Sequence, residues 1–193
     1  MRNATLTLLL FFAIIGCQKK ESILETEKKA LNSVFNEVID SVYYRLTNDK
    51  ISLNNKSKKT IVVNDSLYPE SPGYVQFRDH FKNVENLYFD TISKKIRQKI
   101  DLNLFTKEAK FKYQYLSSIK QNPIREDFWN SKYALPGFLV FSKINFDEHK
   151  KYGVLYCSFT NGDIYKAKWF LIYIKKSGRD WELDEIHAQR RMY

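Results

Sequence analysis

The hydrophobic residues of this chain follow two periods, which divide it into a helical N-terminal part and a β-rich C-terminal part. Between residues 22 and 47, apolar side chains recur every three or four positions and form one stripe, as an amphipathic helix requires. The stripe consists of Leu24, Leu31, Val34, Phe35, Val38, Val42 and Leu46. Ser22 and Glu25 have the spacing of a capping box. The pattern predicts a helix over residues 22–47 with its stripe against a core.

The next stretch gives shorter patterns. Residues 60–63 are a β-branched run that predicts a strand, and residues 74–82 predict a short helix that points Phe77 and Phe81 inward. His80 lies in this helix beside Asp79, and neighbouring residues do not share a helix face. We therefore interpret His80 as a surface histidine.

Residues 84–116 carry mixed signals. Ile92 and Ile96 have helical spacing, whereas Ile100, Leu102 and Leu104 alternate as in a strand. We expect a helix over 91–98, a strand over 99–105 and a second strand over 110–116 that forms a hairpin with it. Farther along, Asn122-Pro123 is a suitable start for a short helix.

The C-terminal third alternates more regularly and predicts four consecutive strands. They cover residues 138–146, 154–160, 164–175 and 181–188. Asn161-Gly162 and Ser177-Gly178 are typical of two-residue turns, which match the twist of the flanking strands. Consecutive strands joined by short turns form an antiparallel meander.

Turn length also predicts which residues face each other in the meander. With two-residue turns, Val154 opposes Trp169 and Ile172 opposes Leu183. One face then carries Leu155, Cys157, Phe159, Phe170, Ile172, Ile174, Trp181 and Leu183, while the other carries Tyr156, Tyr165, Trp169, Leu171 and Tyr173, next to Glu182 and Asp184. A sheet that is apolar on both faces needs cover on both, or one face is a binding surface.

The first 17 residues form a separate unit. A positive charge at Arg2 precedes an apolar run over residues 6–15, which is too short to cross a bilayer. The run ends in Ile14-Ile15-Gly16-Cys17, which resembles the lipobox of bacterial lipoproteins. The resemblance implies cleavage of a signal peptide over residues 1–16, acylation of Cys17 with palmitate among its lipids, and a short tether over 17–21. An ordinary secretory signal and a buried N-terminal helix are the alternatives.

A second resemblance covers about the last 60 residues. The pattern Gly137-Phe-Leu-Val-Phe-Ser142, Phe146-Asp147-Glu148, Tyr152-Gly153 and a closing strand at Trp181 is similar to uncharacterised lipoprotein domains of Bacteroidetes-type bacteria. It implies no activity. Many such domains carry a Cys-Gly repeat after the second strand, which this chain lacks, so no role of paired cysteines carries over.

The net charge of +10 favours an anionic partner in principle, but the 32 Lys and Arg residues are spread along the chain among 22 acidic ones. No nucleic-acid-binding motif is present. We expect no nucleic-acid partner, and we interpret the lysines as a solvated surface. The segment Gln18-Lys19-Lys20 has no acidic run, which favours a position on the outer membrane facing the periplasm.

The sequence predicts no cofactor, no metal site and no catalytic residue. The three histidines, at positions 80, 149 and 187, lie far apart and in no ligand-spaced motif, although folding could bring two together. Cys157 lies between apolar residues and is interpreted as a buried, inert thiol. Glu182 and Asp184 point the same way from one strand, which two hydrolytic carboxylates could use; alternating acids on an edge strand are more often solvated.

The aromatic group Tyr156, Tyr165, Trp169 and Tyr173 is the preferred candidate surface, because flat rings with polar tips suit a glycan or a partner's side chains. This group is preferred over the other candidate sites. The sequence nevertheless favours the interpretation that the helix over residues 22–47 packs against these rings, in which case they are not a binding surface.

These observations predict a single α+β domain over residues 22–193, with a long N-terminal helix on an antiparallel sheet. We expect a lipid-anchored, non-enzymatic protein of the cell envelope that binds an envelope protein or glycan. A hydrolase that uses the acidic residues, and a toxin-neutralising or scaffolding protein, are the alternatives.

Overall fold

The computed structural model describes residues 22–47, 59–82, 84, 98–105, 109–119, 137–160 and 167–189. Several predictions from the sequence lie outside these residues. They are the leader with Cys17, most of the helix over 91–98, the helix from Asn122, the turn Asn161-Gly162 and Tyr165.

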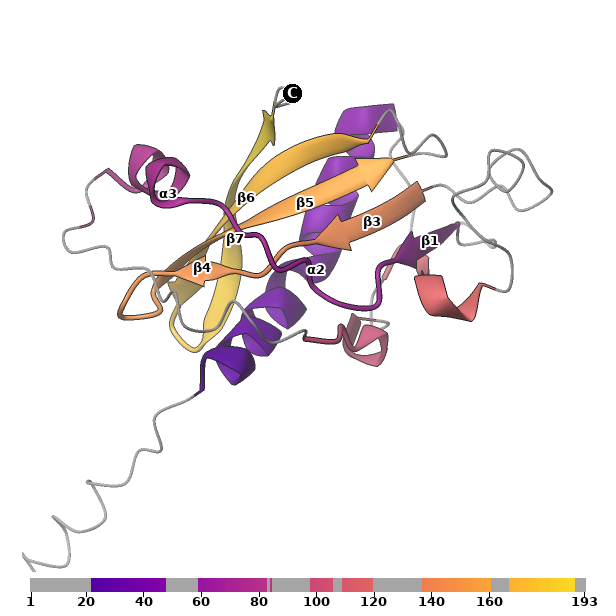
Figure 1. Cartoon of the computed structure of the whole chain (residues 1–193), viewed down its shortest axis with the longest axis horizontal. Coiled ribbons are helices and arrows are strands. Elements are labelled where there is room, and N and C mark those ends of the chain that lie inside the picture. Colours follow the sequence, from indigo (N-terminus) through magenta and orange to yellow (C-terminus); the bar gives the residue numbers. More distant parts are fainter. Residues whose placement is uncertain are drawn as a thin grey trace, which may run out of the picture.

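The long N-terminal helix is confirmed as α2, Ile23–Thr47. Its start is set by Ser22, whose hydroxyl accepts a hydrogen bond of 3.2 Å from the Glu25 amide, as the capping-box spacing predicts. Its apolar stripe is buried against the sheet, and in Figure 1 the helix runs behind the strands. Among the described residues, no helix combines the length and the apolar character that crossing a membrane needs.

The described strands form one seven-stranded sheet of mixed direction. Their bounds are β1 Thr60–Val63, β2 Lys112–Tyr115, β3 Gly137–Phe141, β4 Asn145–Phe146, β5 Tyr152–Thr160, β6 Lys168–Ser177 and β7 Asp180–Gln189. The order is β2-β1-β3-β5-β6-β7, with β4 paired to β5. The α+β class is therefore confirmed, but the sheet is only partly antiparallel, because β1 runs parallel to both β2 and β3.

The hairpin predicted between residues 99–105 and 110–116 is wrong. β2 pairs with β1, and the expected first strand contains instead the 3-10 helix η2, Leu102–Phe105. The hydroxyl of Tyr115 explains the difference, since it donates to the Ile100 carbonyl at 2.8 Å and accepts from the Leu102 amide at 2.9 Å. One side chain thus satisfies backbone groups that a strand would have paired. A second 3-10 helix, η3, Leu116–Ser118, follows β2.

The strand predicted over residues 138–146 is interrupted. Leu139 and Phe141 of β3 point into the same core as Ile144 and Phe146, so the alternation changes phase between the two pairs. The carboxylate of Glu27 on α2 accepts a hydrogen bond of 2.6 Å from the Ile144 amide. The Glu27 side chain thus satisfies a backbone donor in the break, and the prediction of one continuous strand over residues 138–146 is wrong.

The meander of β3 to β7 is confirmed, but both predicted registers are wrong. Val154 opposes Tyr173 rather than Trp169, a shift of four residues that leaves the faces unchanged because side chains alternate with a period of two. Leu183 opposes Ile174 rather than Ile172, because the turn before β7 uses Gly178 and Arg179. Gly178 has φ +61°, a conformation that glycine adopts without strain.

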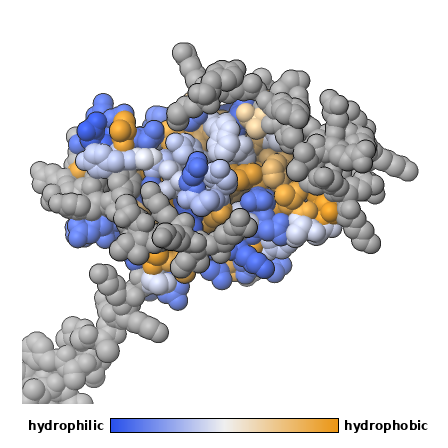
Figure 2. All heavy atoms as spheres, viewed as in Figure 1, coloured by the Kyte–Doolittle hydropathy of each residue, from blue (hydrophilic) through white to orange (hydrophobic). Residues whose placement is uncertain are grey.

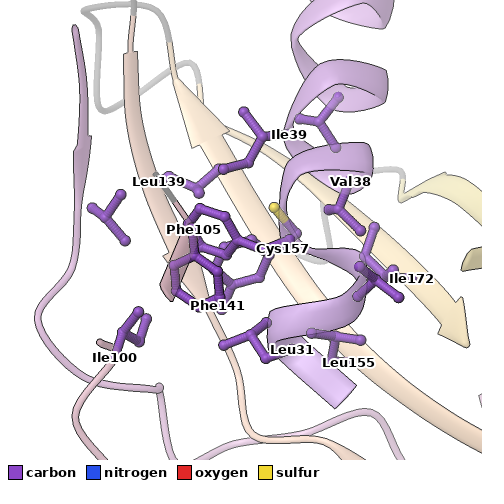
Figure 3. Close-up of a cluster of buried hydrophobic side chains, with 14 of the residues drawn as sticks. Leu31, Val38, Ile39, Ile100, Phe105, Leu139, Phe141, Leu155, Cys157 and Ile172 are labelled. Atoms are coloured by element: carbon purple, nitrogen blue, oxygen red, sulfur yellow. The ribbon is translucent and has the colours of Figure 1, made fainter. Parts of the chain in front are cut away.

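The main core lies between α2 and the sheet. Phe35 on the helix stacks on Phe105 with ring centroids 3.8 Å apart and also meets Phe141. Figure 3 shows the sulfur of Cys157 among these apolar side chains. The short helix α3, Tyr74–His80, buries Phe77 and Phe81 against the opposite face of the sheet. The prediction that both phenylalanines point inward is confirmed, and the expectation that the long helix covers the aromatic face is wrong.

Candidate functional site on the outer face of the sheet

We call the sheet surface opposite α2 the outer face. Its apolar part is a small core in which Phe77 of α3 and Phe81, the residue after α3, pack on Val154, Leu171 and Tyr173. The Tyr173 hydroxyl donates to the Gln76 carbonyl at 3.2 Å and so fastens α3 to β6. This short helix covers only part of the outer face.

Tyr156 and Trp169 lie on the part of the outer face where the rings are less covered. Trp169 is 38% exposed and meets the half-buried Tyr156 edge to face, with centroids 6.2 Å apart. Burial, followed by the nearby charge of Glu70, raises the pKa of the Tyr156 hydroxyl. In Figure 2 the coloured surface in this view is a mixture of hydrophobic and hydrophilic residues.

The predicted aromatic surface is therefore divided. Trp169 and Tyr156 offer ring surface to a partner, whereas Tyr173 is 3% exposed and lies under α3. Tyr165 lies outside the described residues. The sequence could not show this division, because the covering helix is about 90 residues away in the chain.

A second group of side chains gathers beside Tyr173, and a β-bulge positions it. The pairing of β6 with β7 shifts between Tyr173 and Ile174, so that Tyr173 opposes Glu185 while Ile174 opposes Leu183. Asp184 is the extra residue. Bulges of this kind re-aim side chains, and here the consecutive residues Asp184 and Glu185 both reach His80.

His80, the last residue of α3, lies between these two carboxylates. Its Nε2 is 2.7 Å from an Asp184 oxygen, and its Nδ1 is 3.4 Å from a Glu185 oxygen. The ring stacks on Tyr173 with centroids 3.8 Å apart and planes 15° apart. Only 13% of the side chain is exposed, so His80 is not the surface histidine that the sequence suggested.

His187 joins the same group from β7. Its Nε2 lies 2.7 Å from the other oxygen of Glu185, and its ring centroid is 5.7 Å from that of His80. Donor atoms of His80, Glu185 and His187 all lie within 4.8 Å of one another. We call these three residues the His-Glu-His cluster.

The sequence predicts no metal site, and the prediction did not include this cluster. Glu185 and His187 have the spacing that places two side chains on one face of a strand, and this was the available signal. His80 could not be added, because nothing in the sequence shows where α3 docks. His149 is exposed in the turn after β4 and is not part of the group.

The pair of acids considered from the sequence, Glu182 and Asp184, does share one side of β7. Both contact Lys175, at 3.6 and 2.8 Å from its Nζ. Partial burial alone would raise the pKa of Asp184, but hydrogen bonds from Lys175 and His80 lower it below its ordinary value. A general acid in glycoside hydrolysis needs a raised pKa, so Asp184 does not have the property of such an acid.

Cys157 is fully buried in the main core. Burial raises the pKa of its thiol, which disfavours the reactive thiolate. Its environment agrees with the interpretation of an inert thiol.

A scan against protein-family models finds no match, and searches of the curated proteins and of the solved structures find none either.

Proposed function

We propose that this protein is a lipid-anchored, non-enzymatic protein of the bacterial cell envelope that binds another envelope component through the open part of its outer face. The observation that carries the binding part is the exposure of Trp169 next to Tyr156 on a sheet whose opposite face is buried in the main core with α2. Large aromatic rings at a surface contribute contact area at a low cost in side-chain entropy, and they are enriched among the residues that dominate binding energy.

The anchoring part rests on the resemblance of Ile14-Ile15-Gly16-Cys17 to a lipobox. Lipid chains contribute about 0.8 kcal/mol for each buried methylene, so two or three chains on one cysteine hold a protein almost permanently. The described domain begins at residue 22, so an acylated Cys17 would leave a tether of a few residues between the bilayer and α2. The domain would then work close to the membrane surface, where an envelope protein or glycan is the expected partner.

The anchor is tested by replacing residues 1–17 with an ordinary cleavable secretory signal. We expect the native chain to stay in the membrane fraction through a high-salt wash, and the replaced chain to move to the soluble envelope fraction. A replaced chain that still sediments with membranes would contradict the anchor, because the association would then belong to the folded domain.

The binding surface is tested by cross-linking in intact cells and purification of the anchored protein. Trp169→Ser should reduce recovery of the cross-linked component at least about ten-fold, which corresponds to loss of one dominant aromatic contact. Tyr44→Ser is the matched control, because Tyr44 is an exposed aromatic residue on α2. Equal recovery with Trp169→Ser and with the native chain would contradict the assignment of the surface.

A further inference from the structure

The His-Glu-His cluster has a geometric property that the proposed function does not use. Both ring nitrogens of His80 face carboxylates, Nε2 toward Asp184 and Nδ1 toward Glu185. A neutral imidazole has one N–H and one lone pair, and a carboxylate only accepts. One nitrogen would therefore turn a lone pair toward a negative oxygen, and a cation at Nδ1 removes this conflict.

Protons on His80 Nδ1 and His187 Nε2 would each satisfy one oxygen of Glu185, but the same convergence also presents both imidazoles and the carboxylate to a single cation. The Nε2 of His187 lies 2.7 Å from the second oxygen of Glu185. Two imidazole nitrogens and one carboxylate thus surround one point from α3 and β7. A metal ion can accept electron pairs from all three groups together, whereas a proton is shared by one pair.

We infer that His80 Nδ1, His187 Nε2 and the Glu185 carboxylate form a binding site for a divalent transition-metal ion of the zinc type. Imidazole together with carboxylate is a ligand set that suits zinc and its first-row neighbours, and not calcium or magnesium. Ligand atoms about 2.0 Å from a tetrahedral ion lie about 3.3 Å from each other. The separation of 3.4 Å between His80 Nδ1 and Glu185 fits this spacing, and small side-chain rotations bring in His187.

The surroundings hold His80 in the orientation that the site needs. Asp184 accepts from Nε2–H, which leaves the lone pair on Nδ1, the arrangement by which a second carboxylate orients a metal-binding histidine. Tyr173 stacks on one side of the ring, and Phe81 meets it edge to face at 4.5 Å. Asp184 is thus a positioning residue, and His80 is fixed before an ion arrives.

The local charge also suits a cation, although the chain as a whole is strongly basic. Carboxylate oxygens of Asp184 and Glu185 lie 2.7 and 3.4 Å from the two ring nitrogens of His80, so negative charge is concentrated at this ring. Glu185 and His187 are about half exposed, so an ion can reach the site from solvent, and a water molecule can occupy the remaining coordination position.

The test is isothermal titration of the untagged full chain with zinc chloride in detergent. All proteins carry Cys17→Ser, so that the Cys17 sulfur is not a possible ligand whether or not it is acylated. We expect one zinc ion per chain, with no response to calcium or magnesium. His187→Ala and Glu185→Gln change half-exposed side chains, which limits their effect on folding, and each should weaken zinc binding at least about ten-fold.

His149→Ala is the matched control and should bind zinc as the parent does, because His149 is an exposed histidine in the turn after β4 and is not one of the three proposed ligands. Asp184→Asn should weaken binding about ten-fold while the stoichiometry stays at one. With cobalt in place of zinc, the parent should show the intense visible absorption of a tetrahedral site, and His187→Ala should lose it. Absence of zinc binding, or equal weakening by His149→Ala and His187→Ala, would overturn the proposal.

Discussion

At the scale of single residues, Glu27 links the long helix to the break in the sheet. It is 4% exposed in the second turn of α2, and its carboxylate accepts a hydrogen bond from the Ile144 amide. Burial raises its pKa from 4.5 to about 7, against the opposing effects of that hydrogen bond and of Lys143. A group whose folded pKa is raised favours the folded state fully below its unfolded pKa, and this contribution is lost as the pH rises through the folded pKa.

This shift predicts how stability depends on pH. As the pH rises from about 4.5 to above 7, ionisation of Glu27 should lower the free energy of unfolding by about 3 kcal/mol. Glu27→Gln keeps an oxygen for the Ile144 amide but cannot ionise, so urea titrations at about pH 4.5 and pH 8 should show a correspondingly smaller difference. Glu148→Gln, which removes an exposed carboxylate, is the control. An unchanged pH dependence in Glu27→Gln would contradict this account.

At the scale of elements, the sequence predicted those helices and strands whose own residues carry the signal. α2 was found from its cap and its stripe, and β5 to β7 from their alternation, because these signals lie within each element. The parallel pairing of β1 with β2, and the break before β4, depend on partners far away in the chain. The Ile144 amide, for example, is held by a residue 117 positions earlier. No local pattern contains such information.

In the candidate site, too, the sequence predicted only what local patterns determine. Trp169 and Tyr156 could be placed on one face from the period of the strands, and the four-residue error in register left that face unchanged. The bulge at Asp184 could not be predicted, since nothing in the local sequence separates a bulged strand from a regular one. His80 reaches the cluster only because α3 docks on the outer face, a long-range contact carried by Phe77 and Tyr173.

At the scale of the whole molecule, the two faces of the sheet serve different purposes. α2 closes one face with the main core, while the smaller α3 leaves Trp169 exposed and positions His80 on the other. Figure 1 places α2 behind the strands. The larger core is thus on one side of the sheet, and the outer face carries the smaller core, the proposed partner surface and the proposed metal site.

The central claim is that this domain works while attached to a membrane by lipid on Cys17, and intact-mass measurement of the protein isolated from its native envelope tests it most directly. We predict a chain that begins at Cys17 and is heavier than its amino-acid sequence by the mass of the attached lipid. A chain that begins at Met1 with no added mass would contradict the claim.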